Sequence, residues 1–320
     1  MSRISRYQDN IDSFLKRKSC ITKMNNSNYN IVTNILDQCD HLSSLLLLTV
    51  LNSQCKKKHL KLVHGYFMAC GIDIMMLLNR INDNRAQYEE NYGKDKIVNL
   101  KMELLQMVTM CLTRNIDTVQ SNMDKQTTLK ISQACHNYLS GKIYDICKYD
   151  SFVADKKMKK FDVMNYNFDN KSSIMTKLGK MYRIDKDTLV TYVESHYGNA
   201  CKSAAVLGWL LGDGDEKSIS ILEDIGNHFG MILKIQYDFV NLENDIKLCN
   251  KTTTNLLVNM GVQECHAMFM ESKIKFIEGC MKLNIYTNTA KEMIDLIESK
   301  IDACLEKSTL DMKSIYSSFS

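Results

Sequence analysis

The stretch from Leu222 to Asp245 is the feature that most constrains the fold. Its apolar residues recur at steps of three and four, which is the pattern of a long helix with one buried face. This stripe consists of Leu222, Ile225, Phe229, Ile232, Ile235, Phe239 and Leu242. Gly226 and Gly230 lie about one turn apart, where the missing side chains allow another helix to approach closely. We therefore expect this helix to pack inside a larger helical structure.

Helix-breaking residues are scarce along the whole chain. The 320 residues include no proline and only 13 glycines. Proline removes a helix hydrogen bond and glycine costs conformational entropy, so their scarcity favours helices. The absence of proline is also compatible with an AT-rich genome. The composition predicts a nearly all-helical protein, of the all-α class.

Charge, cysteines and hydropathy exclude several function classes. Lys and Arg number 41 against 37 acidic residues, which is too balanced to predict nucleic-acid binding. The 12 cysteines include no C-x-x-C pair, so ordinary reduced thiols are expected rather than a zinc ribbon. The apolar run Leu45–Leu51 is too short for a membrane span, and the N-terminus is no signal peptide. We expect a cytoplasmic protein without a membrane span.

The end of the long helix carries three polar side chains. Tyr237, Asp238 and Asn241 occupy positions i, i+1 and i+4, so the first and last share one face. The surrounding sequence resembles the second aspartate-rich helix of trans-prenyl diphosphate synthases, which read roughly G-x-x-F-Q-I-x-D-D-x-x-D-x-x-x-D. In this chain, Tyr237 and Asn241 stand where that family has two metal-binding aspartates.

A second segment is similar to the first aspartate-rich helix of the same family. Residues 103–106 read E-L-L-Q, as they do at the start of that helix, and the resemblance makes Gln106 a substrate contact. The family's D-D-x-x-D begins seven residues after this glutamine. Here Thr113, Arg114 and Asp117 occupy its three acidic positions.

Further weak matches follow in the family's order. They concern positions that bind diphosphate or substrate in those synthases. The residues are Lys58 and Lys61 in the G-K-x-x-R slot, Lys142 in the G-Q-x-x-D slot, His196 in the K-T slot, Lys234, and Lys251 in the G-K-x-T slot.

The resemblance implies one domain with a known architecture. We expect residues 31–320 to form the antiparallel helical bundle of isoprenoid synthases. Residues 1–30 are polar and are expected to form a weakly ordered lead-in. Residues 148–170 are charged and poorly periodic, which predicts an inserted exposed loop.

The substitutions bear on the chemistry that the resemblance implies. In those synthases, aspartates on two facing helices hold magnesium ions, which bridge the diphosphate of an allylic substrate. Asp117 and Asp238 are the acidic residues left in the motifs and are the candidate metal ligands. Magnesium is expected only if the chain is active. Arg114, Lys142 and Lys234 suggest instead a cavity that contacts an isoprenoid diphosphate directly, although solvated surface charges explain them equally well.

The sequence therefore favours a synthase-like protein that has lost catalysis. It would be retained for binding, scaffolding or a regulatory role, as a homodimer or as a heterodimer with an active prenyl synthase. The alternative is a divergent prenyltransferase that condenses an allylic diphosphate with isopentenyl diphosphate. A terpene cyclase is the third alternative.

Overall fold

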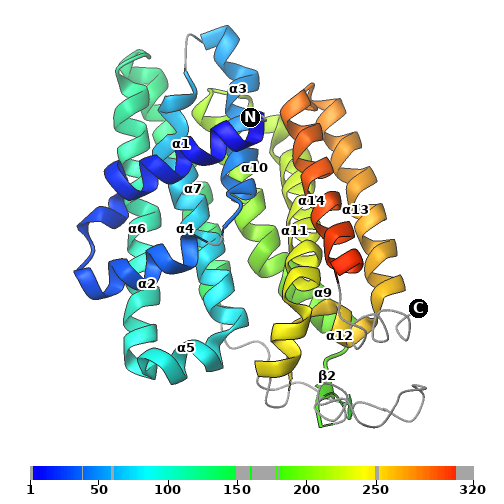
Figure 1. Cartoon of the computed structure of the whole chain (residues 1–320). Helices are drawn as coiled ribbons and strands as arrows, with labels where there is room; N and C mark the ends of the chain where they lie inside the picture. The colour runs from blue at the N-terminus through cyan, green and yellow to red at the C-terminus, as the bar shows by residue number, and fades with distance from the viewer. Residues whose placement is uncertain are drawn as a thin grey trace.

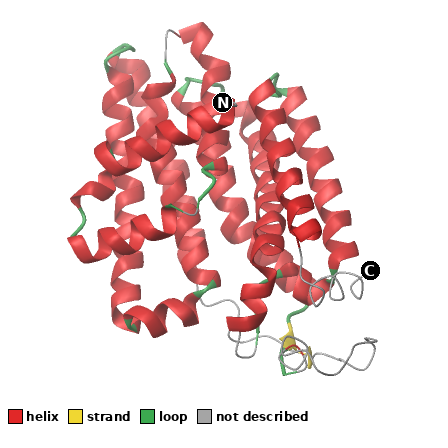
Figure 2. Ribbon diagram, in the orientation of Figure 1, coloured by secondary structure: helices red, strands yellow, loops and turns green. Residues whose placement is uncertain are grey.

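A computed structural model describes residues 3–37, 39–58, 61–148, 159–160, 178, 180–248 and 252–307. This part of the chain is a bundle of helices, as predicted (Figures 1 and 2). The helices are α1 (Arg3–Lys18), α2 (Asn26–Leu36), α3 (Leu42–Lys58), α4 (Tyr66–Asp83), α5 (Arg85–Tyr92), α6 (Lys94–Gln120), α7 (Lys125–Lys148), α9 (Lys186–Val193), α10 (Asn199–Leu211), α11 (Ile219–Leu248), α12 (Leu256–Met260), α13 (Val262–Lys282) and α14 (Asn288–Lys307). Two strands of two residues each, β1 (Lys159–Lys160) and β2 (Tyr182–Arg183), pair antiparallel.

The long helix predicted from the apolar stripe is α11, and it packs against α10 and α13. Its two glycines allow the close approach that the sequence indicated. A Cβ atom on Gly226 would lie 2.4 Å from the backbone of Lys202, and one on Gly230 would lie 2.7 Å from that of Tyr197. These distances are too short for a side chain, so both positions require glycine.

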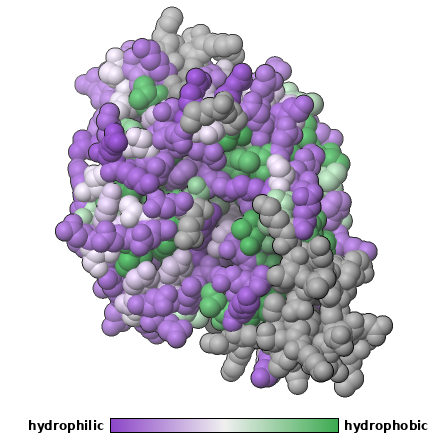
Figure 3. Space-filling view, viewed as in Figure 1, coloured by the Kyte–Doolittle hydropathy of each residue, from purple (hydrophilic) through white to green (hydrophobic). Residues whose placement is uncertain are grey.

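The core lies around α3, α4 and α10. Almost every residue of α10 is buried, and α4 is buried on most of its circumference. Helices that are apolar on all sides belong inside a protein. Most charged side chains lie outside, and the face shown in Figure 3 is mainly hydrophilic.

The segment before α10 departs from regular helix geometry. The N-cap of α9 is Asp185, whose side chain accepts the Thr188 N–H. A π-helical turn, η3 (Glu194–Gly198), joins α9 to α10. Such turns inside helices often occur at functional sites. This turn lies against α11.

The expectation of a weakly ordered segment at residues 1–30 was wrong. Residues 3–18 form α1, and Ile4, Ile11 and Leu15 on one face are buried in the core. The polar composition hid this stripe, because the three residues are separated by seven and four positions. The domain boundary predicted at residue 31 therefore leaves out a helix that packs on the bundle.

The predicted insertion at 148–170 lies almost wholly outside the described residues. None of the helices in the described ranges is both long enough and apolar enough to cross a bilayer.

Candidate functional site

A buried group of three charges joins the end of α4 to α11. The Nζ atom of Lys234 lies 2.7 Å from Oδ1 of Asp238 and 3.1 Å from Oδ2 of Asp83. The three side chains are 1%, 0% and 5% exposed. Buried charges are retained only when they are paired and hydrogen-bonded, so each acid depends on the ammonium.

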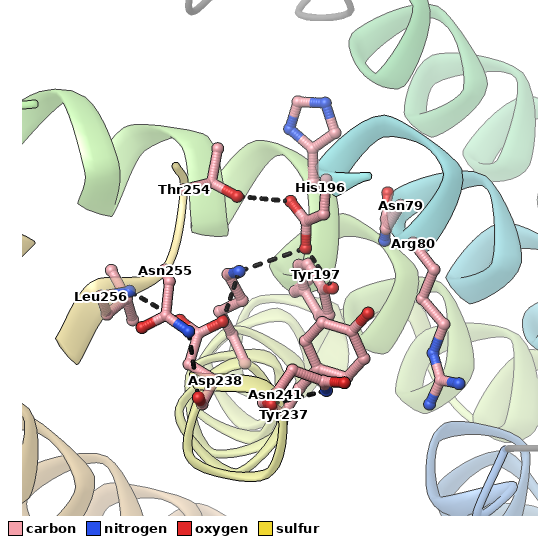
Figure 4. Close-up of polar contacts among 12 residues, drawn as sticks. Asn79, Arg80, His196, Tyr197, Tyr237, Asp238, Asn241, Thr254, Asn255 and Leu256 are labelled. Carbon is pink, nitrogen blue, oxygen red and sulfur yellow. Dashed lines mark hydrogen bonds and ion pairs between the residues drawn. The ribbon is translucent and has the colours of Figure 1, made fainter. Parts of the chain in front are cut away.

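The carboxylate of Asp83 has all of its acceptor positions filled. Its Oδ1 accepts hydrogen bonds from the hydroxyls of Tyr192 and Thr254, and its Oδ2 from Tyr197 and Lys234. Figure 4 shows Thr254 and Tyr197 on this side of the site and Asp238, Asn255 and Leu256 on the other. Burial alone would raise the pKa of Asp83. The ammonium and the three hydroxyl donors outweigh burial and hold this pKa below its ordinary value.

Asp238 is held from the opposite side by the start of α12. Its Oδ2 accepts the backbone N–H of Leu256 at 2.8 Å, and the Asn255 amide donates to the Asp238 carbonyl and to Oδ2 of Asp245. Burial raises the pKa of Asp238 to about 7, although Lys234 opposes the shift. Burial likewise raises the pKa of Asp245 to about 6.

Aromatic rings surround the ammonium. The Nζ atom of Lys234 lies 5.4 Å from the ring centre of Tyr197 and 5.7 Å from that of Tyr237. The guanidinium of Arg80 lies 5.1 Å from the Tyr237 ring centre, and the Asn84 amide donates to the Tyr237 hydroxyl. The rings favour cations, so they add to the stability of the buried lysine.

A cavity of about 290 Å³ opens beside the three charges. Asp83, Asp245 and Lys234 line it, together with Tyr237 and Thr252–Thr254. Lys234 is already engaged by two carboxylates, so the acidic side chains dominate the charge of the cavity. This charge disfavours a diphosphate.

The residues of this site do not fit a magnesium cluster. Magnesium requires carboxylate oxygens with free lone pairs in near-octahedral geometry. The oxygens of Asp83 and Asp238 are occupied by protein donors, and the Lys234 ammonium takes the place of a cation between them. Within the described ranges, no three His, Cys, Asp or Glu side chains are arranged to hold a metal ion.

The structure does not bring together Asp117 and Asp238, the two candidate metal ligands. Asn115 of α6 accepts the N–H of Met68 at the start of α4, whereas Asp83 ends α4. Asp83 lies 15 residues after Met68 on α4, and this length of helix spans roughly 23 Å. Asp117, Arg114 and Thr113 are exposed at the far end.

Sequence reasoning missed three residues of α4: Asn79, Arg80 and Asp83. Of these, Arg80 lies over the ring of Tyr237 on α11, and Asp83 pairs with Lys234 of the same helix. They have the i, i+1, i+4 spacing of Tyr237, Asp238 and Asn241, so spacing was the available signal. This signal was weak because Asp83 is the only acidic residue among these three positions. Asn241 itself donates to the backbone carbonyl of Tyr237.

The other predicted substrate contacts are dispersed. Lys142 pairs with Glu223 at 2.8 Å, and His196 is buried with Nδ1 3.0 Å from the carbonyl oxygen of Tyr192. Lys61 and Gln106 are exposed. The side chain of Lys58 and the whole of Lys251 lie outside the described residues. The cations that the structure places therefore form no common cavity with Lys234.

Comparison with known proteins identifies the fold. No protein-family model and no curated sequence matches the chain. A FPP/GFPP synthase from Zymomonas mobilis superimposes with a TM-score of 0.60 at 11% identity, over 93% of this chain and 98% of that one. Geranylgeranyl pyrophosphate synthetase from the archaeon Geoglobus acetivorans superimposes with a TM-score of 0.60 at 11% identity, over 93% of this chain and 97% of that one. Geranyltransferase from Legionella pneumophila superimposes with a TM-score of 0.58 at 12% identity, over 94% of this chain and 96% of that one. The chain thus has the all-α fold of trans-prenyl diphosphate synthases.

Proposed function

We propose that this chain is a non-catalytic protein with the trans-prenyl synthase fold, which acts by associating with another subunit. The observation that carries the proposal is the position of Lys234. Its ammonium lies between Asp83 and Asp238, on the two helices that present the i, i+1, i+4 motifs.

The charge at this site opposes prenyl transfer. Ionisation of an allylic diphosphate requires concentrated positive charge at the leaving group. Here one ammonium faces Asp83 and Asp238, and Asp245 lies nearby. A diphosphate entering the cavity would meet more negative than positive charge. The site would neither bind the leaving group nor stabilise its departure.

An exposed apolar surface on α6 and α7 supports a role in association. Val98 and Met102 of α6 are 45% and 64% exposed, and Leu129 and Tyr144 of α7 are both 68% exposed. The two helices pack against each other. Val98 and Met102 are one turn apart on the same face of α6, and exposed apolar side chains that lie together in this way are typical of interfaces. We propose a second subunit of the same fold, most simply another copy of this chain, as the partner.

A product assay tests the loss of catalysis. The purified protein would be incubated with Mg²⁺, dimethylallyl diphosphate and isopentenyl diphosphate, beside an active synthase as control. We expect no prenyl product. Product that disappears in an Asp83→Asn/Asp238→Asn variant would establish the alternative, a divergent active prenyltransferase.

Sedimentation of the wild type and of Val98→Glu and Met102→Glu tests the association. We expect a dimer that both substitutions dissociate. A monomeric wild type that also forms no complex with an active synthase would refute the proposal. A complex formed with the synthase alone would make this chain a regulatory subunit rather than a homodimer.

A further inference from the structure

We propose that a second cavity, between α1, η1 (Cys20–Lys23) and α6, binds a small phosphate-bearing anion. Its volume is about 290 Å³, and Lys18, Lys23 and Arg114 line it. It lies at the end of α6 far from Asp83 and Lys234. This site is therefore separate from the central charges and goes beyond the proposed function.

Three cations converge on this cavity from three different elements. Lys18 ends α1, Lys23 ends η1, and Arg114 belongs to the last turns of α6. In the described part of the chain, no acidic side chain forms an ion pair with Lys18 or Lys23. Lys16, one half-turn earlier, pairs with both Asp12 and Asp37. Two of the three cations in the cavity lining, Lys18 and Lys23, thus have no acidic partner among the described residues.

Asp117 is the acidic residue in the lining, and it binds Arg114 weakly. Its Oδ2 lies 4.0 Å from Nη1 of Arg114, and the two side chains are 59% and 53% exposed. Exposed pairs at such a distance contribute little. The planar guanidinium therefore keeps donors for a phosphate, which it can bind through two parallel hydrogen bonds.

The thiol of Cys20, in the cavity lining, responds to the same positive charge. Its pKa is lowered to about 7, first by a hydrogen bond with Cys111 and then by the charges of Lys23 and Arg114, against the effect of burial. The part of this shift that comes from Lys23 and Arg114 supports a positive potential inside the cavity, where an anion would be stabilised.

The end of helix α1 explains only part of this charge. Basic residues in the last turn of a helix interact favourably with its free carbonyls, and α1 ends in Lys16, Arg17 and Lys18. That effect accounts for Lys18. It does not account for Lys23 or Arg114, which come from other elements.

The size and charge of the cavity indicate the class of ligand. Three cations against one carboxylate leave a net charge of about +2 in the lining. Phe67 supplies an apolar wall beside the charges. A phosphate or diphosphate group fits the charged part, and inorganic diphosphate is the simplest probe.

Titration calorimetry with inorganic diphosphate, without divalent metal, tests the site. We expect Lys23→Gln and Arg114→Gln each to weaken binding about tenfold, since a charge-assisted contact is lost. Asp117→Asn should strengthen binding about threefold, because repulsion is removed. Lys275→Gln on α13, which also removes one surface charge, should leave the affinity unchanged.

A rise in affinity in Asp117→Asn distinguishes a site from damage to the fold, because misfolding only weakens binding. No heat of binding to the wild type, or equal losses in Lys275→Gln and Arg114→Gln, would overturn the proposal. Flotation with phosphatidylcholine vesicles, with and without phosphatidic acid, separates the two sources of phosphate. We expect diphosphate to bind and the vesicles not to bind. Vesicle binding that Arg114→Gln abolishes would assign the site to a lipid headgroup.

Discussion

Replacing Lys234 by methionine isolates the role of the buried ammonium. Methionine keeps most of the side-chain length and removes the charge. Asp83 and Asp238 would then face each other without a counter-ion, inside a site where both are almost fully buried.

The magnitude follows from the two distances. At an effective dielectric constant of about 20, contacts at 2.7 Å and 3.1 Å correspond to about 6 and about 5 kcal/mol of attraction. Desolvation of the ammonium offsets much of this sum. Removal of one partner from a buried pair typically costs about 3–5 kcal/mol, which is the loss we expect in the free energy of unfolding. That is a large part of the stability of an ordinary domain, about 5–15 kcal/mol.

The assay is urea denaturation of wild type, Lys234→Met and a control, Lys247→Met. Lys247 lies on the same helix and pairs with Glu243 at i−4, but its side chain is 56% exposed. We expect the control to lose less than about 1 kcal/mol. The reasoning would be refuted if Lys234→Met and Lys247→Met lost equal stability.

Two further predictions concern pH and packing. In the folded protein, the pKa of Asp245 is raised from 3.8 to about 6, so this side chain keeps its proton in a pH range where the unfolded chain releases it. The free energy of unfolding therefore falls as pH rises from about 4 to about 6. Asp245→Asn should therefore add about 3 kcal/mol to the free energy of unfolding at pH 8 and nothing at pH 3, and an equal gain at both would contradict this. Gly230→Ala should lower the free energy of unfolding by at least about 2 kcal/mol, because its Cβ would meet the Tyr197 backbone, whereas Gly141→Ala, with nothing within 4 Å, should add about 0.5–1 kcal/mol. Thermal denaturation of both variants checks the pair, and equal effects would contradict it.

The regular parts of the fold were predictable from local patterns. The apolar stripe of α11 predicted the central helix, and Gly226 and Gly230 predicted that another helix packs closely against it. The structure confirms both predictions. Helix α1 was missed because its three buried side chains are spread among polar ones.

The site was harder to predict because its parts are far apart in sequence. Lys234 and Asp238 are four residues apart on one helix, so their pairing was foreseeable. Asp83 is 151 residues from Lys234, and only the packing of the bundle brings them together. The E-L-L-Q match directed attention to Asp117 on α6, while the facing residues lie on α4.

The position of Lys234 is tested most directly by a crystal structure of the protein grown with Mg²⁺ and a bisphosphonate. The account predicts the Lys234 ammonium between Asp83 and Asp238, with no metal ion bound to either carboxylate. Magnesium ions that bridge these two carboxylates to the bisphosphonate, with Lys234 displaced, would contradict it.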